Sequence, residues 1–417
     1  MAYDEISALL GGWPGFVIRR VTRSPGGTRS GAPQVSIELD PVAGATRYCS
    51  RCGQATKQVH DVAERRIREL PILEAETWLV LRLARVACPT CGPTVEGLPW
   101  LDRYARMTKR FAESVARLAQ VLPIKQVAEW FGLSWDTVQA IDQAELEARL
   151  GPVNLQDVRQ IVIDEFAIQK GHRYATVIAQ PLTREVLWVG RGRKREDLRP
   201  FFELLGPEGC ARLEAAVMDM GEAYEMETRA HCPQATIVYD LFHVVAKFAR
   251  EVIDRVRVDA TNRIAPASGR ADQTRARRRV IKGARWLLLR NKEHLPHKDR
   301  IRLKELLALN RHLWVVYVLK DGLKDIWHYK YTAAARRAWD AWYGWAIRSR
   351  IPPLVAFARK LKVKLPGILA HCRFPLHTGV LEGMNNKIKV LKRMAYGFRN
   401  DAYFFLKIRA AFPGNPR

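Results

Sequence analysis

The stretch Ile161–Gln180, IVIDEFAIQKGHRYATVIAQ, decides how the rest of the chain is organised. It opens with a short β-branched run, Ile161 to Ile163, that leads into the carboxylates of Asp164 and Glu165. After a polar turn, a second β-rich run covers residues 174–179. Short apolar runs bounded by turn residues are typical of buried strands. A carboxylate that ends a buried strand is costly to desolvate without a positive partner, so the stretch predicts a cation, and a divalent metal is the natural one.

The composition is that of a folded protein with an unusual charge. Of the 417 residues, 48% are hydrophobic and 27% are charged, which fits several globular domains. The chain has 69 Lys and Arg residues against 43 Asp and Glu residues, a formal net charge of +26. Phosphate groups are the partners for which such an excess is useful. Nucleic acid is therefore the first expectation, and an anionic membrane surface is the second.

No stretch has the properties of a membrane-spanning or secretory segment. The longest apolar run, near residues 78–87, is interrupted by Arg82 and Arg85 and falls short of the roughly 20 residues that a spanning helix needs. Asp4 and Glu5 stand where a secretory signal carries Lys or Arg. We therefore expect a soluble, cytoplasmic protein.

Four of the seven cysteines form two C-x-x-C pairs, in YCSRCG and ACPTCG. Each pair lies in a tight turn that ends in glycine, an arrangement that lets two thiolates reach one ion. Cys49, Cys52, Cys88 and Cys91 therefore predict one tetrahedral zinc site in a β-rich module. The alternative is four cysteines that hold no metal. The odd total argues against a disulfide framework.

Helical periodicity begins after residue 103. Thr108 to Leu122 predicts one helix, which Pro123 ends. The next segment, IKQVAEWFGLSWDTVQAIDQ, predicts a short helix, a turn at Gly132 and a second helix that runs to Ile141. This pattern is typical of a helix-turn-helix, whose second helix lies in the major groove, although a plain helical hairpin is the alternative. The side chains expected to face DNA are Trp135, Asp136, Thr137 and Gln139.

The central region, residues 158–256, alternates strands with helices. Three predicted strands come in succession, a helix follows, and two further strands end in Asp219 and Asp240. This is the element order of the RNase H-like fold, a mixed sheet flanked by helices. Carboxylates stand at the ends of the first and fourth strands of that fold, the places that Asp164 and Asp219 occupy.

Residues 257–375 are predicted to be mostly helical. The run RARRRVIKGARWLLLR repeats positive charge without acids, which favours contact with DNA phosphates, although a solvated face is the alternative. The DNA contacts expected there are Arg275, Arg277, Arg278, Arg279, Lys282, Arg285 and Trp286. The tryptophans Trp339, Trp342 and Trp345 have helical spacing and predict core packing in preference to a base-stacking platform.

A last motif, TGVLEGMNNKIKVLKRMAYGFRN, lies near the C-terminus. Glu382 opens a predicted helix of amides and cations, which suits a metal ligand beside a phosphate backbone. The alternative is an acid that complements the helix dipole. The DNA contacts expected on this helix are Asn386, Lys389, Lys392 and Arg393.

In this order and spacing, the motifs CSRCG, CPTCG, IDEFAIQKGHRY, VMDMGEAY, YDLFHV and LEGMNNKIKVLKRMAYGF resemble those of bacterial insertion-sequence transposases of the DDE type, in the ISL-three group with an N-terminal zinc finger. The resemblance spans nearly the whole chain. It implies an enzyme that cleaves DNA strands and transfers them. By this resemblance Asp164, Asp219 and Glu382 form the catalytic triad, which holds two Mg²⁺ (or Mn²⁺) ions, and Asp240 and His243 support it.

The resemblance also implies an organisation and partners. The expected fold is a multidomain α/β protein: a four-cysteine zinc-binding β module, a helix-turn-helix, and an RNase H-like mixed-sheet core interrupted by a mostly helical insertion. The partners are double-stranded DNA, as terminal inverted repeats and as target, with a homodimer or larger assembly on DNA in the bacterial nucleoid. The expected domains are 1–100 (zinc-binding), 101–150 (helix-turn-helix), 151–256 with 376–417 (catalytic) and 257–375 (helical insertion).

Other interpretations suit parts of the sequence. Glu165 and Glu222 are neighbouring acids that compete for a place in the triad. A transcription regulator would use the zinc finger and the helix-turn-helix, but it leaves the three acids without a purpose. A structure-selective nuclease of the RNase H superfamily would use the acids, but it needs neither two DNA-reading modules nor a large insertion. A transposase accounts for all of these features.

Overall fold

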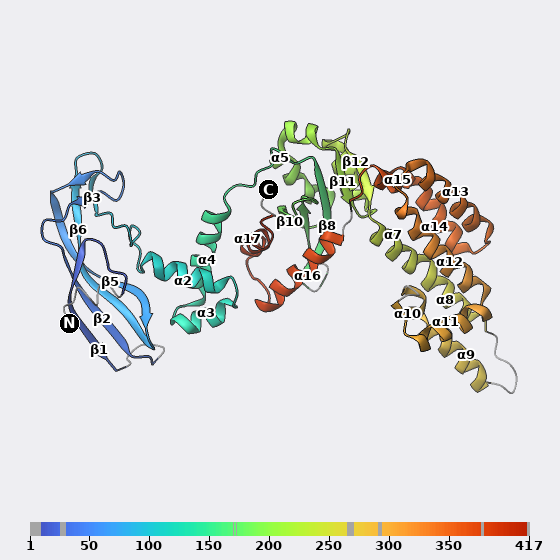
Figure 1. Cartoon of the computed structure of the whole chain (residues 1–417), viewed down its shortest axis with the longest axis horizontal. Coiled ribbons are helices and arrows are strands. Elements are labelled where there is room, and N and C mark those ends of the chain that lie inside the picture. The colour runs from blue at the N-terminus through green and yellow to red at the C-terminus, as the bar shows by residue number, and fades with distance from the viewer. Residues whose placement is uncertain are drawn as a thin grey trace. The chain divides into compact units, whose positions relative to one another are not determined.

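Figure 1 shows a computed structural model of the whole chain. The chain divides into two compact units. Unit 1 comprises Met1–Gly151 and Leu391–Leu406, and unit 2 comprises Pro152–Val390 and Lys407–Arg417. Among the described residues, no helix has the length and apolar character needed to cross a membrane. The structure describes residues 10–25, 31–169, 171, 173–264, 271–290, 294–376 and 379–414, with backbone alone at 271 and 380–382.

The N-terminal part of unit 1 is a five-stranded sheet in the order β1-β2-β6-β5, with β7 paired to the end of β6. β5 and β6 form a long antiparallel hairpin, and β2 joins β6 in parallel. Apolar side chains that alternate along the strands bury one face around Ile37, Leu79 and Leu81. The strands are β1 (Phe16–Ser24), β2 (Gln34–Pro41), β5 (Val59–Ile72), β6 (Ala75–Cys88) and β7 (Gly92–Val95), with a separate pair β3 (Arg47–Tyr48) and β4 (Ala55–Thr56).

Three helices follow this sheet: α2 (Lys109–Ala119), α3 (Ile124–Phe131) and α4 (Trp135–Leu150). The hydroxyl groups of Thr108 and Ser134 cap α2 and α4, as these residues do at helix starts. Gly132, with φ +63°, ends α3 in the left-handed conformation that a tight turn between helices requires. The predicted helix-turn-helix geometry is therefore present, and its second helix runs past Ile141 to Leu150.

Unit 1 also contains a segment from the C-terminal region. Leu391–Leu406 includes the end of α16 (Gly379–Met394) and the start of α17 (Asp401–Ala411). Tyr403, which is 1% exposed, donates a hydrogen bond from its hydroxyl to the buried carboxylate of Asp142 in α4. Burial, together with this carboxylate, raises the pKa of Tyr403, so the phenol remains a donor. Unit 1 is thus built from two segments far apart in the sequence.

Unit 2 is built on a mixed five-stranded sheet in the order β10-β9-β8-β11-β12. β8, β9 and β10 pair as antiparallel neighbours, whereas β11 lies parallel to both β8 and β12. Phe201 and Phe202 of α5 share a buried core with Ile163 and Ile178 of the sheet. The elements are β8 (Gln160–Gln169), β9 (Arg173–Ala179), β10 (Val186–Arg191), α5 (Arg195–Arg212), β11 (Ala215–Met218), α6 (Glu222–His231) and β12 (Thr236–Tyr239).

The first strand of this sheet is longer than the sequence predicts. The apolar run ends at Ile163, but β8 continues to Gln169 because β9 pairs with it as far as that residue. β11, on the other side, pairs with β8 only as far as Val162. Asp164 therefore lies inside its own strand and not at the strand end, but just beyond the point where the neighbouring strand stops.

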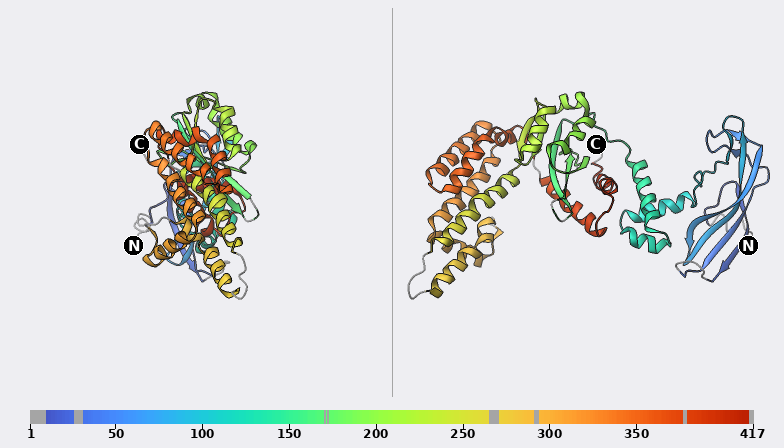
Figure 2. Two further views of the ribbon diagram at one scale, coloured as in Figure 1. Left: turned by 90° about the vertical axis from the view of Figure 1, so that its right-hand side faces the viewer. Right: turned by 180° about the vertical axis from the view of Figure 1, so that it is seen from behind.

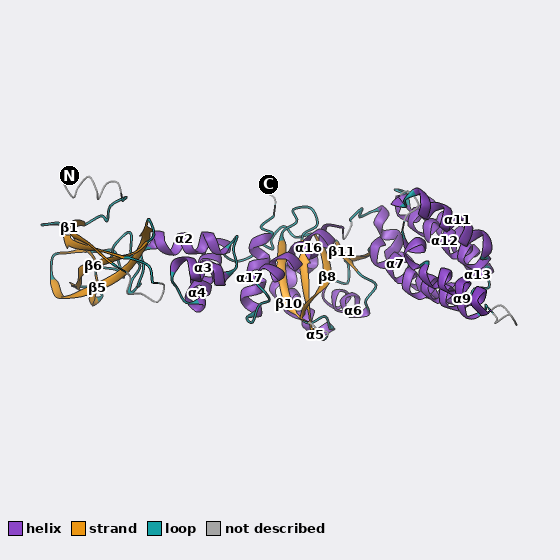
Figure 3. Ribbon diagram, turned by 90° about the horizontal axis from the view of Figure 1, so that it is seen from below, coloured by secondary structure: helices purple, strands orange, loops and turns teal. Residues whose placement is uncertain are grey.

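The named elements after β12 are all helices (purple in Figure 3). α7 (Leu241–Phe248), a π-helical turn (Ala249–Ile253) and α8 (Asp254–Asn262) follow one another, and later helices share one core with them. Figure 2 shows these helices gathered in a bundle. The later elements are α9 (Ala271–Gly283), α10 (Arg285–Leu289), α11 (His297–Leu309), α12 (Arg311–Asp325), α13 (Thr332–Arg348), α14 (Pro352–Val363) and α15 (Leu365–Leu369), with 3-10 turns at Ile326–His328 and Ala370–Cys372.

The tryptophans of α13 are divided between core and surface. Trp339 and Trp342 are 1% and 4% exposed, which confirms the prediction of core packing for these two. Trp345 is 39% exposed and lies against Trp314 of α12, with ring centroids 6.2 Å apart. The prediction of core packing is therefore wrong for Trp345, because the helix turns this position to the surface.

Candidate active site and metal centres

Two aspartates stand at the same end of two neighbouring parallel strands, Asp164 within β8 and Asp219 directly after β11. The register of β8 and β11 pairs Val162 with Val217. Asp164 comes two residues after Val162, and Asp219 comes two residues after Val217, one residue past the end of β11. The register therefore brings the two aspartates to the same end of the sheet. The topology of the sheet thus brings together two acids that the sequence separates by a strand pair and a helix.

Asp240 directly follows the next strand, β12, and completes a row of three aspartates with Asp164 and Asp219. Met218 and Tyr239 are the last pair of β11 and β12, so Asp219 and Asp240 are the next residue of each segment. Its backbone N–H donates to the Met218 carbonyl at 3.3 Å. Its side chain is buried and caps α7 by accepting the backbone N–H of His243 at 3.3 Å. Asp240 thereby fixes the first turn of α7, which carries His243 beside the row.

Asp164 is 8% exposed, and both of its carboxylate oxygens have partners. Oδ1 accepts the backbone N–H of Glu165 at 2.9 Å and lies 3.8 Å from Nε2 of His243. Oδ2 accepts the side-chain amide of Asn385 at 2.7 Å. Burial raises the pKa of Asp164 and the charge of Asp219 adds to this effect, while His243 and the two hydrogen bonds oppose it. A nearby cation would therefore stabilise the ionised form of Asp164.

Asp219 follows β11 and is held by the turn that starts α6. Its Oδ1 accepts the backbone N–H of Gly221 at 2.8 Å. A Cβ atom at Gly221 would lie 2.7 Å from that same oxygen, which is closer than real Cβ contacts come. Only glycine therefore lets this carboxylate fold back over the turn, and the MDMG sequence encodes the arrangement.

The two competing acids have other surroundings. Glu165 is the strand neighbour of Asp164 and therefore belongs to the opposite side of the pleat. Its carboxylate lies 3.5 Å from the guanidinium of Arg193. Burial raises the pKa of Glu165, and the charges of Asp219 and Asp164 raise it further. Glu165 is therefore close enough to interact electrostatically with both aspartates, although it is not one of the three in the row. Glu222 is exposed in the first turn of α6.

The side chain of Glu382 lies outside the described part of the structure, although its backbone belongs to α16. Asn385 comes three positions later on the same helix, so the two positions share one face. The hydrogen bond from Asn385 to Asp164 brings that face of α16 to the sheet, and Figure 1 shows α16 beside β8. For the third predicted acid, the structure thus shows the position of its helix but not of its side chain.

The donor set of the row suits a hard divalent cation. Asp164 and Asp219 offer carboxylate oxygens whose charges act on each other, and burial holds back the ionisation of Asp164. A divalent cation would relieve both effects. Oxygen ligands suit Mg²⁺ or Mn²⁺, whereas thiolates suit zinc. Among the described side chains, only four cysteines form a group of three or more metal-binding residues whose ligand atoms all lie within 4.8 Å.

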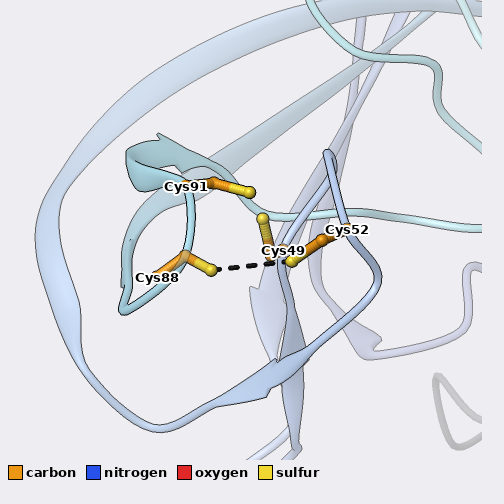
Figure 4. A group of neighbouring side chains, drawn as sticks. All are labelled: Cys49, Cys52, Cys88 and Cys91. Atoms are coloured by element: carbon orange, nitrogen blue, oxygen red, sulfur yellow. Dashed lines mark hydrogen bonds between the residues drawn. The ribbon is translucent and has the colours of Figure 1, made fainter.

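Those four residues are the predicted zinc ligands (Figure 4). Cys49 and Cys52 lie in the turn between β3 and β4, Cys88 ends β6, and Cys91 lies in the turn before β7. The sulfur atoms of Cys52 and Cys88 are 3.6 Å apart. Four thiolates about 2.3 Å from one Zn²⁺ make a tetrahedral structural site, and sulfur atoms this close can share such an ion.

Glycine shapes each of the two cysteine turns. Gly53 and Gly92 directly follow the second cysteine of each pair and have φ values of +72° and +70°. A backbone hydrogen bond from Cys52 lowers the pKa of Cys49 to about 6, whereas a hydrogen bond with the Cys52 side chain raises the pKa of Cys91 to about 12. One thiol thus ionises readily near neutral pH, and metal binding must release the protons of the others.

The predicted recognition helix, α4, has an accessible start. Trp135 is 41% exposed, Asp136 is exposed, and Thr137 and Gln139 are half-buried. Val138, between the last two, is fully buried and holds the inner face of the helix. The first turns of α4 therefore remain open to a ligand.

The predicted basic run forms α9 and α10. The exposed members are Arg275, Arg277, Arg279, Lys282, Arg285 and Trp286. Two of the arginines meet acids: Arg275 lies 2.8 Å from Asp272, and Arg285 lies 3.1 Å from Asp254. Arg278 is half-buried and donates to the Ile264 carbonyl at 2.6 Å, so its guanidinium is engaged within the protein.

The last predicted DNA contacts lie along α16. Met384 and Ile388 are buried and define the inner face of this helix. Asn386, Lys389 and Arg393 are exposed, and Lys392 is half-buried.

Two contacts go beyond the predicted site residues. Asn385 reaches Asp164, and Gly221 holds Asp219. The sequence carries a signal for each: Asn385 follows Glu382 by three positions, and Gly221 follows Asp219 by two.

Comparison with protein families matches three parts of the chain. A family described as a helix-turn-helix domain of transposase family ISL3 matches residues 96–144. One described as the zinc-finger of transposase IS204/IS1001/IS1096/IS1165 matches residues 45–91. A third, described as transposase, matches residues 161–408 and so covers more than half of the chain.

Two relatives match along most of their length. The chain is 49% identical over 411 residues to the transposase for insertion sequence element IS1001 of Bordetella parapertussis, covering 98% of each chain. It is 32% identical over 385 residues to the transposase for insertion sequence element IS1557 of Mycobacterium tuberculosis (strain CDC 1551 / Oshkosh), covering 88% of this chain and 86% of that one. These matches confirm the predicted zinc finger, helix-turn-helix and DNA transposase function. The chain therefore belongs to the ISL3 family of transposases.

Proposed function

We propose that this transposase cleaves and joins DNA strands by a DDE mechanism, with Asp164, Asp219 and Glu382 as the acid triad. The observation that carries the proposal is the strand register, which pairs Val162 with Val217 and so brings Asp164 and Asp219 to the same end of the sheet. A regulator that only binds DNA has no use for two carboxylates brought together in this way. Cleavage of a phosphodiester bond does have a use for them, because charge builds on the attacking and leaving oxygens and metal-binding carboxylates gather there.

The acid site is proposed to hold two Mg²⁺ or Mn²⁺ ions. Asp164, Asp219 and Glu382 are the residues that would hold them. Such ions, when bound, supply Lewis-acid stabilisation to both oxygens of an in-line displacement. His243, 3.8 Å from Asp164, orients that carboxylate, and Asp240 sets the start of the helix that carries His243. The contribution of this chain to catalysis is then to hold the carboxylates in fixed orientations, so that the reacting groups meet in the correct geometry.

The DNA is proposed to be held by several modules. One structural Zn²⁺ on the four cysteines stabilises the β module, and the start of α4, with Trp135, Asp136, Thr137 and Gln139, reads the transposon ends. Contacts to the DNA backbone position the duplex without reading its sequence. We assign that role to the basic residues of α9, α10 and α16 named above, with the smallest contribution from Arg278, which is engaged inside the protein.

We propose the same functional domains that the sequence predicts: 1–100, 101–150, 151–256 with 376–417, and 257–375. Because two transposon ends must be brought together, the working form is proposed to be a homodimer or a larger assembly on DNA. DNA as the substrate also places the protein on the bacterial nucleoid.

The test is strand cleavage and joining on a supercoiled plasmid that carries the ends of the element, in the presence of Mg²⁺. Asp164→Ala, Asp219→Ala and Glu382→Gln should each lower the cleavage rate by about three orders of magnitude or more, because catalytic groups that act as a unit fail together. Each variant should still bind the ends in a gel-shift assay. Glu222→Gln removes an exposed acid of α6 and is the matched control, which should cleave at the wild-type rate.

Wild-type protein that binds the ends tightly but does not cleave them in Mg²⁺ or Mn²⁺ would favour a regulator. Cleavage that survives Glu382→Gln would give the third place in the triad to another acid.

A further inference from the structure

Asn385 connects α16 to the row of aspartates. Its side-chain Nδ2 donates to Oδ2 of Asp164 at 2.7 Å, across 221 positions of sequence. We infer that Asn385 is a positioning residue for strand cleavage, which fixes the orientation of the Asp164 carboxylate and offers its own amide oxygen to a cation or water in the site. The inference rests on the proposed acid site and adds a residue outside the predicted triad.

The hydrogen bonds of Asp164 show why Asn385 matters. Oδ1 is held by the backbone N–H of the next residue, Glu165, so this bond belongs to β8 itself. Oδ2 is held by Asn385, which comes from a different element. A carboxylate held at both oxygens has one orientation. Loss of Asn385 would leave the Glu165 bond and the longer approach of His243, neither of which acts on Oδ2.

The chemistry of the partners fixes the direction of the amide. An ionised carboxylate only accepts hydrogen bonds, so the nitrogen of Asn385 faces Asp164 and its oxygen faces away from it. That oxygen, Oδ1, is buried and has no hydrogen-bond partner among the described residues. An unpaired buried acceptor is unfavourable, and a donor or a cation that met it would recover the loss. Amide oxygens are ordinary ligands of hard cations, so the chemistry favours a ligand at this position.

The same contact ties α16 to β8, and the backbone of α16 carries the third acid of the proposed triad. Position 382 lies one turn before Asn385 on the same face of α16. Met384 and Ile388 bury the inner side of this helix, and Asn385 ties it to β8. A shift of α16 along the sheet would therefore move Glu382 and break the Asn385 bond together. Asn385 thus couples the position of the third acid to the orientation of the first.

The experiment uses the full-length, zinc-loaded protein and compares Asn385→Ala and Asn385→Asp with Val390→Ala. Val390 is 50% exposed on the same helix, so its variant controls for changes in α16 alone. Asn385→Ala should lower the cleavage rate at saturating DNA by about 10- to 100-fold, the usual loss when a residue that orients a metal ligand is removed. Binding of Mn²⁺ to the DNA-free protein, followed by electron paramagnetic resonance, should weaken by a similar factor. End binding should stay close to the wild-type value, and the melting temperature should fall only slightly, as expected when one partner of a buried polar pair is lost.

Asn385→Asp separates hydrogen bonding from packing. The aspartate has the shape of asparagine but lacks the donor, and it sets a second negative charge against Asp164. We expect cleavage to be impaired at least as much as in Asn385→Ala. Wild-type cleavage by Asn385→Asp would overturn the inference in favour of a packing role, and this variant decides the matter even where Asn385→Ala folds poorly.

The inference is also overturned if both variants cleave DNA and bind Mn²⁺ as the wild type does. Wild-type protein and Asp164→Ala are run in the same assays. Failure of the wild type to cleave would count against the proposed function, whereas an active wild type with unaffected Asn385 variants would count against the role of Asn385 alone.

Discussion

The two candidate metal sites are assembled in opposite ways. The four cysteines lie between residues 49 and 91, on turns beside neighbouring strands, and their ligand atoms all lie within 4.8 Å. The acid site draws on three strands and on α16, and its contact between Asp164 and Asn385 spans 221 positions. Two local turns and the β5–β6 hairpin between them are thus enough to close a structural site. The acid site depends on the register of a sheet and on a helix that the chain reaches much later.

The largest effect is expected at the cysteines. Cys88→Ser should unfold the four-cysteine module, because a structural zinc contributes about 10–16 kcal/mol to the folding of small zinc domains. The variant should lose its zinc, measured by elemental analysis, and its tight binding to the transposon ends. Cys372→Ser is the matched control, because Cys372 contacts the Tyr329 carbonyl in unit 2, which a serine hydroxyl can also do. A Cys88→Ser protein with full zinc content and wild-type end binding would show that the cluster is not a structural site.

A smaller effect tests whether the stability of unit 1 depends on the C-terminal segment, which is distant in sequence, or only on local contacts like those of the cysteine turns. Tyr403→Phe removes the hydroxyl that donates to the buried Asp142. Loss of one partner of a buried polar pair costs about 1–3 kcal/mol, so the free energy of unfolding measured in urea should fall by that amount. Tyr396→Phe, at a position that is 91% exposed in the same segment, should leave stability unchanged. Equal stability of the two variants would mean that unit 1 does not rely on the distant segment.

The smallest effect concerns the candidate acid site in the absence of added divalent cations. Burial raises the pKa of Asp164 above its ordinary value of 3.8, so the folded protein binds this proton more tightly than the unfolded chain does. The resulting stability is complete below pH 3.8 and is lost as the pH rises through the folded pKa. Without added divalent cations, Asp164→Asn should therefore gain stability relative to wild type between pH 4 and pH 7.

Urea unfolding at these two pH values measures the gain, and added Mg²⁺ should reduce it at pH 7. A stability difference that does not change with pH would show that Asp164 is not held in an unfavourable charged state.

The two sites also differ in how much of each the sequence predicts. Each cysteine pair follows from local spacing, because the pair and its glycine act within one turn, and the β5–β6 hairpin brings the two pairs together. Asp164 and Asp219 follow from the order of strands. The extension of β8 to Gln169 does not, because it depends on pairing with β9.

Two contacts of the C-terminal region could not be predicted from the sequence either. Asn385 meets Asp164, and Tyr403 meets Asp142, across 221 and 261 positions. Helical spacing places Asn385 on the face that carries Glu382, but it does not say which strand that face meets. Partners of this kind are fixed by tertiary packing, which no local pattern records.

The hydrogen bond between Tyr403 and Asp142 also has a consequence for synthesis of the chain. The ribosome makes Asp142 261 residues before it makes Tyr403. At about 5–20 residues per second, the helix α4 exists for roughly 13–50 seconds before this partner is available. Unit 1 therefore reaches its final form only after α16, which carries the third acid of the proposed triad, has been made. A chain that stops before α17 would carry the cysteines and the helix-turn-helix but not the completed unit.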